Sequence, residues 1–173
     1  MRQMLSILFL SAIFGIAAAG QPGPRSPLPF LAEIEGKIVI GMNSAGHEVV
    51  WCVPESGLPI LVVGLNAPEW RSRTDNWVEI KGLVGQGAEG AEMEMREFSL
   101  ERHPPRPGKP PLESEGILDL SGDRAILRTG AGEVPLVGAV NRSYGSGSKV
   151  ELEGTLVAEA GGLAISVAWM ERD

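Results

Sequence analysis

Apolar and polar residues alternate with a period of two along most of the chain beyond residue 30. In one segment, Val150, Leu152 and Leu156 fall on one side, and Glu151 and Glu153 fall on the other. This spacing is typical of half-buried β-strands, because successive side chains point to opposite faces of a sheet. Turn-forming glycines follow at strand-length intervals. The pattern therefore predicts an all-β protein.

Five strands are expected in each half of the chain. Short, evenly spaced strands with no room for helices favour a small antiparallel barrel in each half. The strands are expected at about 34–42, 47–54, 58–65, 77–85 and 91–101, and again at about 114–121, 124–129, 133–140, 149–158 and 162–170.

The two halves carry matching strings at matching places. Glu33–Gly36 corresponds to Glu113–Gly116, and Val78–Gly82 corresponds to Val150–Gly154. In both halves the next shared glycine lies eight residues further on. Such self-similarity indicates one fold written twice, since both copies must satisfy the same architecture.

One segment conflicts with the strand pattern. Residues 91–102 consist largely of strong helix formers and alone would predict a helix. The corresponding segment of the second copy, Leu163–Met170, is alternating and rich in β-branched residues. We therefore predict a strand in both copies, with a bulge near Arg96 and Glu97 that restores the facing of the later residues.

Proline-dense segments divide the chain into five parts. Such segments favour extended, stiff conformations, so the one between the copies is expected to act as a spacer and hinge. The predicted parts are a signal peptide at 1–19, a proline-rich tether at 20–32, a first module at 33–102, a proline-rich linker at 103–112 and a second module at 113–173.

The N-terminus has the three-part pattern of a secretory signal. Arg2 gives a positive start, Met4–Ile16 is almost wholly apolar, and Ala17–Ala19 supplies small residues for cleavage. We expect an exported protein, periplasmic or extracellular, with no membrane span in the mature chain. The lone Cys52 lies in an apolar run and is expected to be a buried hydrophobic residue, not a reactive thiol.

The charge balance is acidic. The sequence holds 15 Lys and Arg against 22 Asp and Glu, and removal of the signal would delete only Arg2 from the basic side. A net negative charge repels phosphate backbones, so nucleic acid is a disfavoured partner at this stage. An unknown exported protein or a glycan is favoured instead.

The residues that usually carry catalysis are scarce. Histidine occurs only at positions 47 and 103, no Gly-x-Ser-x-Gly elbow is present, and no metal site or cofactor is indicated. Residues 85–90 match the form of a dinucleotide-binding glycine motif, but a hairpin turn explains these glycines without a ligand. We therefore expect a protein that is not an enzyme.

One loop, residues 67–77, is rich in groups suited to recognition. Trp70, Arg71 and Arg73 lie within it, and Tyr144 is the weaker analogue in the second copy. Exposed aromatic and guanidinium groups bind ligands well, so these four residues are the candidate ligand-binding set. The favoured alternative is that Trp70 plugs the end of the barrel, because large aromatic side chains in small domains are mostly buried.

The shared strings resemble bacterial OB-fold-like modules of exported proteins, many of unknown function. The resemblance rests on the Glu-x-Glu-Gly opening, the third strand ending in Val-Gly, and the Val-Glu-[Ile/Leu]-x-Gly fourth strand. It implies two OB-like barrels in tandem, with an SH3-like barrel left open, and no catalytic residues. The expected function is a non-catalytic exported binding protein. A nucleic-acid-binding tandem OB protein is the alternative, and a small hydrolase is the second alternative.

Overall fold

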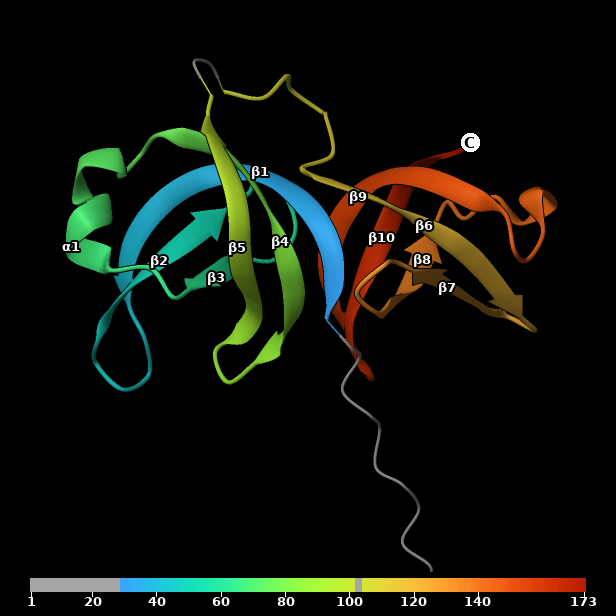
Figure 1. The fold of residues 1–173 in the computed structure, drawn as a ribbon, viewed down its shortest axis with the longest axis horizontal. Coiled ribbons are helices and arrows are strands. Elements are labelled where there is room, and N and C mark those ends of the chain that lie inside the picture. The colour runs from blue at the N-terminus through green and yellow to red at the C-terminus, as the bar shows by residue number, and fades with distance from the viewer. Residues whose placement is uncertain (1–28, 102–103) are drawn as a thin grey trace, which may run out of the picture.

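The computed structural model describes residues 29–101 and 104–173, and it is all-β, as the alternation predicted. Ten strands form one continuous hydrogen-bonded sheet that curls at both ends (Figure 1). The predicted signal peptide and most of the tether lie outside the described residues, so export stays a prediction. Within the described ranges, no helix has the length and apolar content needed to cross a bilayer.

The predicted strands are all present, most within two or three residues of their expected bounds. In the first half they are β1 (Phe30–Met42), β2 (Glu48–Val53), β3 (Ile60–Val63), β4 (Trp77–Gly87) and β5 (Gly90–Leu100), with a short helix α1 (Ala67–Trp70) and a 3-10 turn η1 (Arg71–Arg73) before β4. In the second half they are β6 (Leu112–Ser121), β7 (Arg124–Arg128), β8 (Glu133–Gly138), β9 (Lys149–Glu159) and β10 (Gly162–Arg172), with a 3-10 turn η2 (Arg142–Tyr144) before β9.

The strand order is OB-like in both halves. β1 bonds to β2 and β4, β2 bonds to β3, β3 bonds to β5, and β5 bonds to β4. Each of the first five strands therefore has a bonded neighbour on both sides within this half. β6 to β10 repeat these pairings. The prediction of wholly antiparallel barrels is wrong at one pair in each half, because β3–β5 and β8–β10 are parallel. In the first half, β4 lies between β3 and β5 in the chain but not in the sheet, and β9 lies in the same way between β8 and β10 in the second half. The third and fifth strands of each half therefore run in the same direction.

The predicted bulge in β5 is confirmed. Lys81 of β4 faces Glu97 and the next residue, Gly82, faces Met95, so Arg96 is the extra residue. Ala168 is the extra residue at the corresponding point of β10. Helix-forming side chains at 91–100 thus adopt a strand, since pairing with two neighbouring strands outweighs local propensity.

The glycines shared by the two copies mark points where strands approach closely. A Cβ atom on Gly82 would lie 2.3 Å from the backbone oxygen of Glu94, and one on Gly154 would lie 2.4 Å from that of Ser166. Both contacts are shorter than any real Cβ tolerates, so only glycine fits. The glycines of residues 85–90 end β4 and begin β5 at a hairpin turn, as predicted, with Gly90 at a φ of 113°.

The two halves meet along β1 and β6. Glu33 pairs with Glu113 and Ile34 with Leu112 in an antiparallel ladder, and the Glu35 amide donates to the Pro111 carbonyl at 2.8 Å. We call this contact the β1–β6 joint. It is what makes the ten strands one sheet.

Loops from each half support the joint. The Leu58 amide in the β2–β3 loop donates to the Leu156 carbonyl of β9 at 3.0 Å. From the other side, the hydroxyl of Thr129, in the β7–β8 loop, accepts from the Leu31 amide at 3.3 Å. Each half therefore uses the same loop to satisfy backbone groups of the other half.

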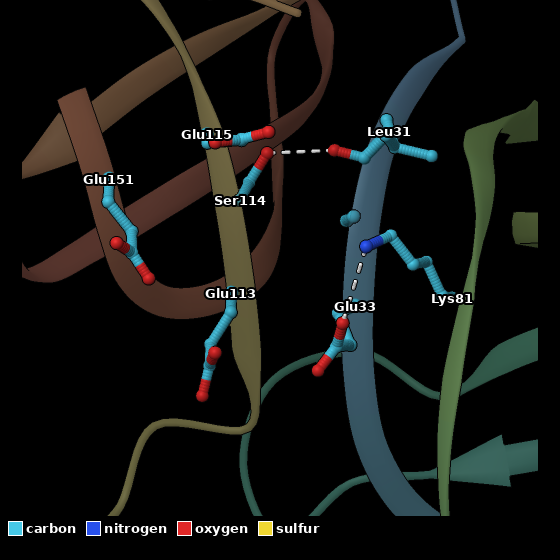
Figure 2. Close-up of a pocket in the computed structure, with 8 residues that line it drawn as sticks. Leu31, Glu33, Lys81, Glu113, Ser114, Glu115 and Glu151 are labelled. Carbon is cyan, nitrogen blue, oxygen red and sulfur yellow. Dashed lines mark hydrogen bonds and ion pairs between the residues drawn. The ribbon is translucent and has the colours of Figure 1, made fainter. Parts of the chain in front are cut away.

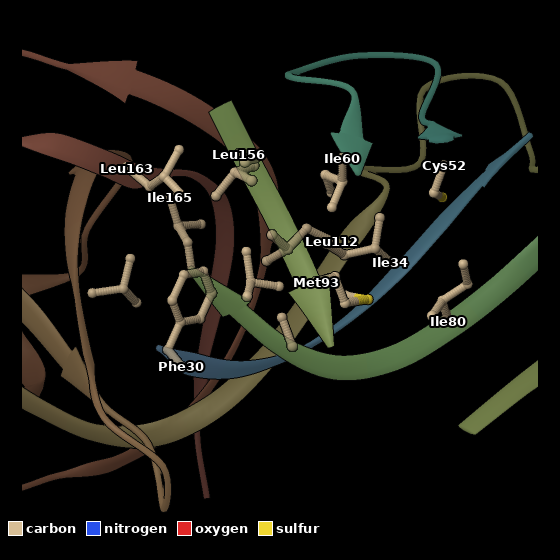
Figure 3. Close-up of a cluster of buried hydrophobic side chains, with 14 of the residues drawn as sticks. Phe30, Ile34, Cys52, Ile60, Ile80, Met93, Leu112, Leu156, Leu163 and Ile165 are labelled. Atoms are coloured by element: carbon tan, nitrogen blue, oxygen red, sulfur yellow. The ribbon is translucent and has the colours of Figure 1, made fainter. Parts of the chain in front are cut away.

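The buried side chains form one cluster that runs through both halves. Phe30, at the start of β1, and Ile165 of β10 both belong to this cluster (Figure 3), and both are almost fully buried. Ile34 and Leu112, which pair across the joint, belong to the same cluster. Strand pairing and a shared core thus hold the two halves in contact. This corrects the expectation of two separate bodies on a proline-rich hinge.

Candidate functional site

The tryptophan of the predicted recognition loop is buried. Trp70 ends α1 with 5% of its surface exposed, and its ring lies 5.1 Å from that of Phe98 in β5. The Arg73 guanidinium stacks on both rings, at 5.0 Å from Trp70 and 5.6 Å from Phe98. Trp70 is therefore buried, as expected of a large aromatic side chain in a small domain, and it offers no free ring face.

The other predicted site residues are held by protein contacts. Arg71 pairs with Glu48 at 2.5 Å on the surface. Tyr144 lies in the second half, partly buried, where its hydroxyl donates to the Met170 carbonyl at 3.3 Å. The four predicted residues do not form one surface, and their role in ligand binding stays a prediction.

A different aromatic residue, Trp51, lies on the outer surface of the first half. It alternates with the buried Val50 and Cys52 of β2, so its side chain points away from the core. Gly41 of β1 makes room for it, because a Cβ there would lie 3.1 Å from two atoms of the indole. The Cδ1–Nε1 edge of the indole thus lies against Gly41, and part of the side chain stays exposed.

Apolar side chains extend this surface across three strands. Trp51 pairs with Val39 of β1 and with Leu61 of β3. Leu61 is buried, yet it does not belong to the core cluster, which agrees with a position on the outer side of the sheet. We call Val39, Trp51 and Leu61, with Gly41, the Trp51 face.

Two loops at the rim of the Trp51 face are tied together. The backbone amide and hydroxyl of Ser44, in the β1–β2 loop, donate to the Glu89 carboxylate in the β4–β5 loop, at 2.5 to 3.2 Å. Asn43 orders the first of these loops by accepting from the amides of Ala45 and His47. In OB-folds, the face of strands two and three and these two loops form the ligand site.

The second half has no such face. Ile126 takes the place of Trp51, since it pairs with Asp119 and Pro135 as Trp51 pairs with Val39 and Leu61. Its neighbour Arg128 is held by Asp119 at 2.5 Å. The β6–β7 turn is also shorter than its counterpart in the first half. Only the first half carries an aromatic platform at this position.

The sequence contained a signal for this face that was not used. Trp51 stands between two apolar residues that alternate with it, which already places it on the side opposite Cys52. The strongly apolar run 49–53, however, favours burial of all its side chains and so hides this alternation. Nothing in the sequence indicated that Gly41 would lie beneath the ring, because that contact depends on strand register.

A second surface, at the β1–β6 joint, is lined by carboxylates. A cleft of about 170 Å³ lies between β1 and β6, with Glu33, Glu113, Glu115 and Glu151 around it (Figure 2). Lys81 is its only basic lining residue and lies 3.8 Å from Glu33. The Ser114 hydroxyl donates to the Leu31 carbonyl at 2.8 Å at the floor of the cleft.

Two carboxyl groups beside this cleft hold their protons more tightly than free glutamate does. Burial raises the pKa of Glu79, and the charges of Glu33 and Glu101 raise it further. Burial also raises the pKa of Glu35, although the Lys109 ammonium opposes the rise. Because like charges face each other here, the arrangement favours cations and repels phosphate.

The described residues contain no group of three or more His, Cys, Asp or Glu side chains arranged to hold a metal ion. Cys52 is buried, and burial raises the pKa of its thiol to about 12. A thiol with such a pKa stays protonated at neutral pH and is a poor nucleophile.

No protein-family model matches the chain, and no curated protein matches it. Solved structures with a similar fold include a deletion mutant of the single-stranded DNA binding protein from Thermus aquaticus, with a TM-score of 0.44 and 11% identity over 86% of this chain and 95% of the other. The wild-type form of that protein has a TM-score of 0.42 and 12% identity over 86% of this chain and 94% of the other.

These neighbours correct one expectation from the charge balance. Both are named as single-stranded DNA binding proteins, so the statement that nucleic acid is a disfavoured partner, with a glycan or exported protein preferred, does not stand. At these identities the likeness concerns the fold alone.

Proposed function

We propose that the protein is a non-catalytic binding protein whose first half takes a single strand of nucleic acid across the Trp51 face. In this proposal each half is an OB-like barrel. The first barrel carries the ligand, and the second one supports it through the β1–β6 joint.

The observation that carries the proposal is the position of Trp51. It lies partly exposed on the outer side of β2, with the Cδ1–Nε1 edge of its indole against Gly41, where OB-folds bind oligonucleotides. A base can stack on an indole whatever its sequence, and such stacking contributes about 1–3 kcal/mol for each base. The partly exposed Val39 extends the apolar surface on the β1 side, and the buried Leu61 packs beside the tryptophan on the β3 side.

The charges near this face determine how the binding depends on salt. Arg71 is already paired with Glu48 of β2, and Lys37, which pairs with Val53 of β2, lies over the ring of Trp77. Glu92 and Glu94 of β5 pair with Leu61 and Val63, so carboxylates border the face. Few phosphates would be neutralised, and the affinity should therefore fall only weakly as the salt concentration rises. Binding would depend mainly on stacking, and we expect a modest affinity.

The test is binding of a fluorescently labelled single-stranded oligonucleotide, followed by anisotropy. We expect Trp51→Ala to weaken binding by about 5- to 150-fold, which corresponds to the loss of 1–3 kcal/mol of stacking. Trp51→Phe keeps a ring and should restore most of the affinity. The matched control is Ile126→Ala, at the same position of the second half, and it should leave the affinity within about twofold.

Two outcomes would refute the proposal. One is a wild-type protein that does not bind the oligonucleotide. The other is an equal loss in the Trp51→Ala and Ile126→Ala variants, which would place the ligand elsewhere. A Trp51-dependent association with oligosaccharides but not with oligonucleotides would keep the face and replace the ligand class.

A further inference from the structure

Glutamates face glutamates across the strands that form the β1–β6 joint. Four direct cross-strand pairs occur there, and like charges directly opposite each other on a sheet destabilise it when both are ionised. The pairs are Glu35 with Glu79, Glu33 with Glu113, Glu113 with Glu153, and Glu115 with Glu151. They involve four strands, β4, β1, β6 and β9, which lie side by side in the sheet.

A few basic groups lie close enough to pair with some of these carboxylates, but not with all of them. Lys109 lies 3.0 Å from Glu113 and 3.7 Å from Glu35, and Lys81 lies 3.8 Å from Glu33. Glu79 differs from these, because the charges that raise its pKa come from three other glutamates, Glu33, Glu101 and Glu113. The charged groups around Glu35 and Glu79 are Glu33, Lys81, Glu97, Glu101, Arg106, Lys109, Glu113, Glu115, Glu151 and Glu153.

The same strands hold the two halves together. The Glu35 side chain has only 12% of its surface exposed, and its backbone amide donates to the Pro111 carbonyl across the joint. Any repulsion at Glu35 therefore acts on the residue that bonds the halves. Water screens it little, because the group is mostly covered.

We propose that the β1–β6 joint is a pH-responsive element of the fold, which tightens in mild acid and loosens as its facing glutamates ionise. Protonation lets a pair of carboxyl groups share a hydrogen bond in place of repulsion. Ionisation of Glu35 and Glu79 puts two negative charges opposite each other on the β1–β4 ladder, at the residue whose amide donates to Pro111 across the joint.

The pKa values give the sign of the effect. Burial and neighbouring carboxylates raise the pKa of Glu79, and burial raises that of Glu35, so both bind protons more tightly in the folded protein than in the unfolded chain. Stabilisation from such a group is fully present below its unfolded pKa and is lost as pH rises through the folded value. The joint should therefore be firmest in mild acid and weaker at neutral pH.

The test is amide hydrogen exchange of the full chain at about pH 5 and about pH 7.5, expressed as protection factors. The amides of Glu35 and Leu58 report on the joint, because both donate across it. The Leu118 amide, bonded to the Ser148 carbonyl within the second half, is the reference. We expect protection at the joint to fall several-fold at the higher pH relative to this reference.

The variant that sharpens the test is Glu79→Gln. It removes a carboxylate whose pKa is raised by burial and by neighbouring glutamates, so it should raise protection at the joint near neutral pH and flatten the pH dependence. The control is Glu159→Gln, an exposed strand glutamate that pairs with Gly162. It should leave the dependence unchanged.

Either of two results would overturn the proposal. The joint amides could follow the reference amide at both pH values, which would show that ionisation acts on the whole fold and not on the joint. Alternatively, Glu79→Gln could leave the pH dependence as steep as in the wild type. Neither result depends on whether the Trp51 face binds nucleic acid.

Discussion

The two halves of the molecule share a scaffold and differ in what they present to solvent. Gly82 and Gly154 each lie against a backbone oxygen of the neighbouring strand, and the bulges at Arg96 and Ala168 occupy corresponding positions. At the centre of the outer face, however, Trp51 of the first half is replaced by Ile126 in the second. The comparison teaches that similarity between the copies marks packing, whereas a candidate site has to be sought where they differ.

The loops follow the same rule. In the first half the β1–β2 loop is long enough to bond Glu89, and a helix with a buried tryptophan precedes β4. In the second half the matching turn is short, and only the 3-10 turn η2 precedes β9. The second half is thus the plainer copy, which fits a supporting role.

The largest expected effects come from the matched core positions Ile80 and Leu152. Each is fully buried, in β4 and β9 respectively, so Ile80→Ala and Leu152→Ala should each lower the free energy of unfolding by about 2–5 kcal/mol. Because one core cluster runs through both halves, we expect a single cooperative transition in each variant, at a lower midpoint. Calorimetry or urea unfolding with two probes checks this.

Two separate transitions, each moved by only one of these variants, would contradict the prediction. The halves would then be independent folding units despite the β1–β6 joint. The exposed change Glu159→Gln serves as the control and should change the free energy of unfolding by less than about 0.5 kcal/mol.

The next-largest losses of stability are expected at the matched glycines, Gly82 and Gly154. Gly82→Ala and Gly154→Ala force a methyl group against a backbone oxygen, and each should destabilise the protein by about 1–3 kcal/mol. Equal losses would support a common scaffold. Gly85→Ala, in the same strand as Gly82, is the control, because its Cβ would make only an ordinary contact of 3.7 Å with Pro29. A loss in this control as large as in the other two would point to strand propensity as the cause.

The smallest expected effects concern the arginines that precede the fourth strand of each half. Arg73 stacks on Trp70 and Phe98, whereas Arg142 donates to the carbonyls of Gly122 and Asp123. Arg73→Ala should cost about 0.5–1 kcal/mol by urea unfolding. Arg73→Lys should recover only part of this, because an ammonium lacks the planar face. Full recovery would show that charge alone matters there.

Much of the fold could be predicted from local pattern. Alternation located the strands. Comparison of the copies predicted a strand at residues 91–102, where composition alone predicts a helix, and a bulge near Arg96, which the structure has. The candidate site could not be found in the same way. Trp70 was a candidate for ligand binding because its loop combines aromatic and guanidinium groups, although burial was favoured, and its partner Phe98 lies 28 positions later in the chain.

The sequence by itself determined the all-β class, the duplication and the strand positions, because a period of two and the glycine positions are local properties of the chain. Only the tertiary structure decided that β3 and β5 run parallel, that Gly41 lies beneath Trp51, and that Glu33 faces Glu113 across the β1–β6 joint. These contacts depend on register and on crossover connections between distant strands. No local pattern encodes them, since they arise when the whole sheet closes around one core.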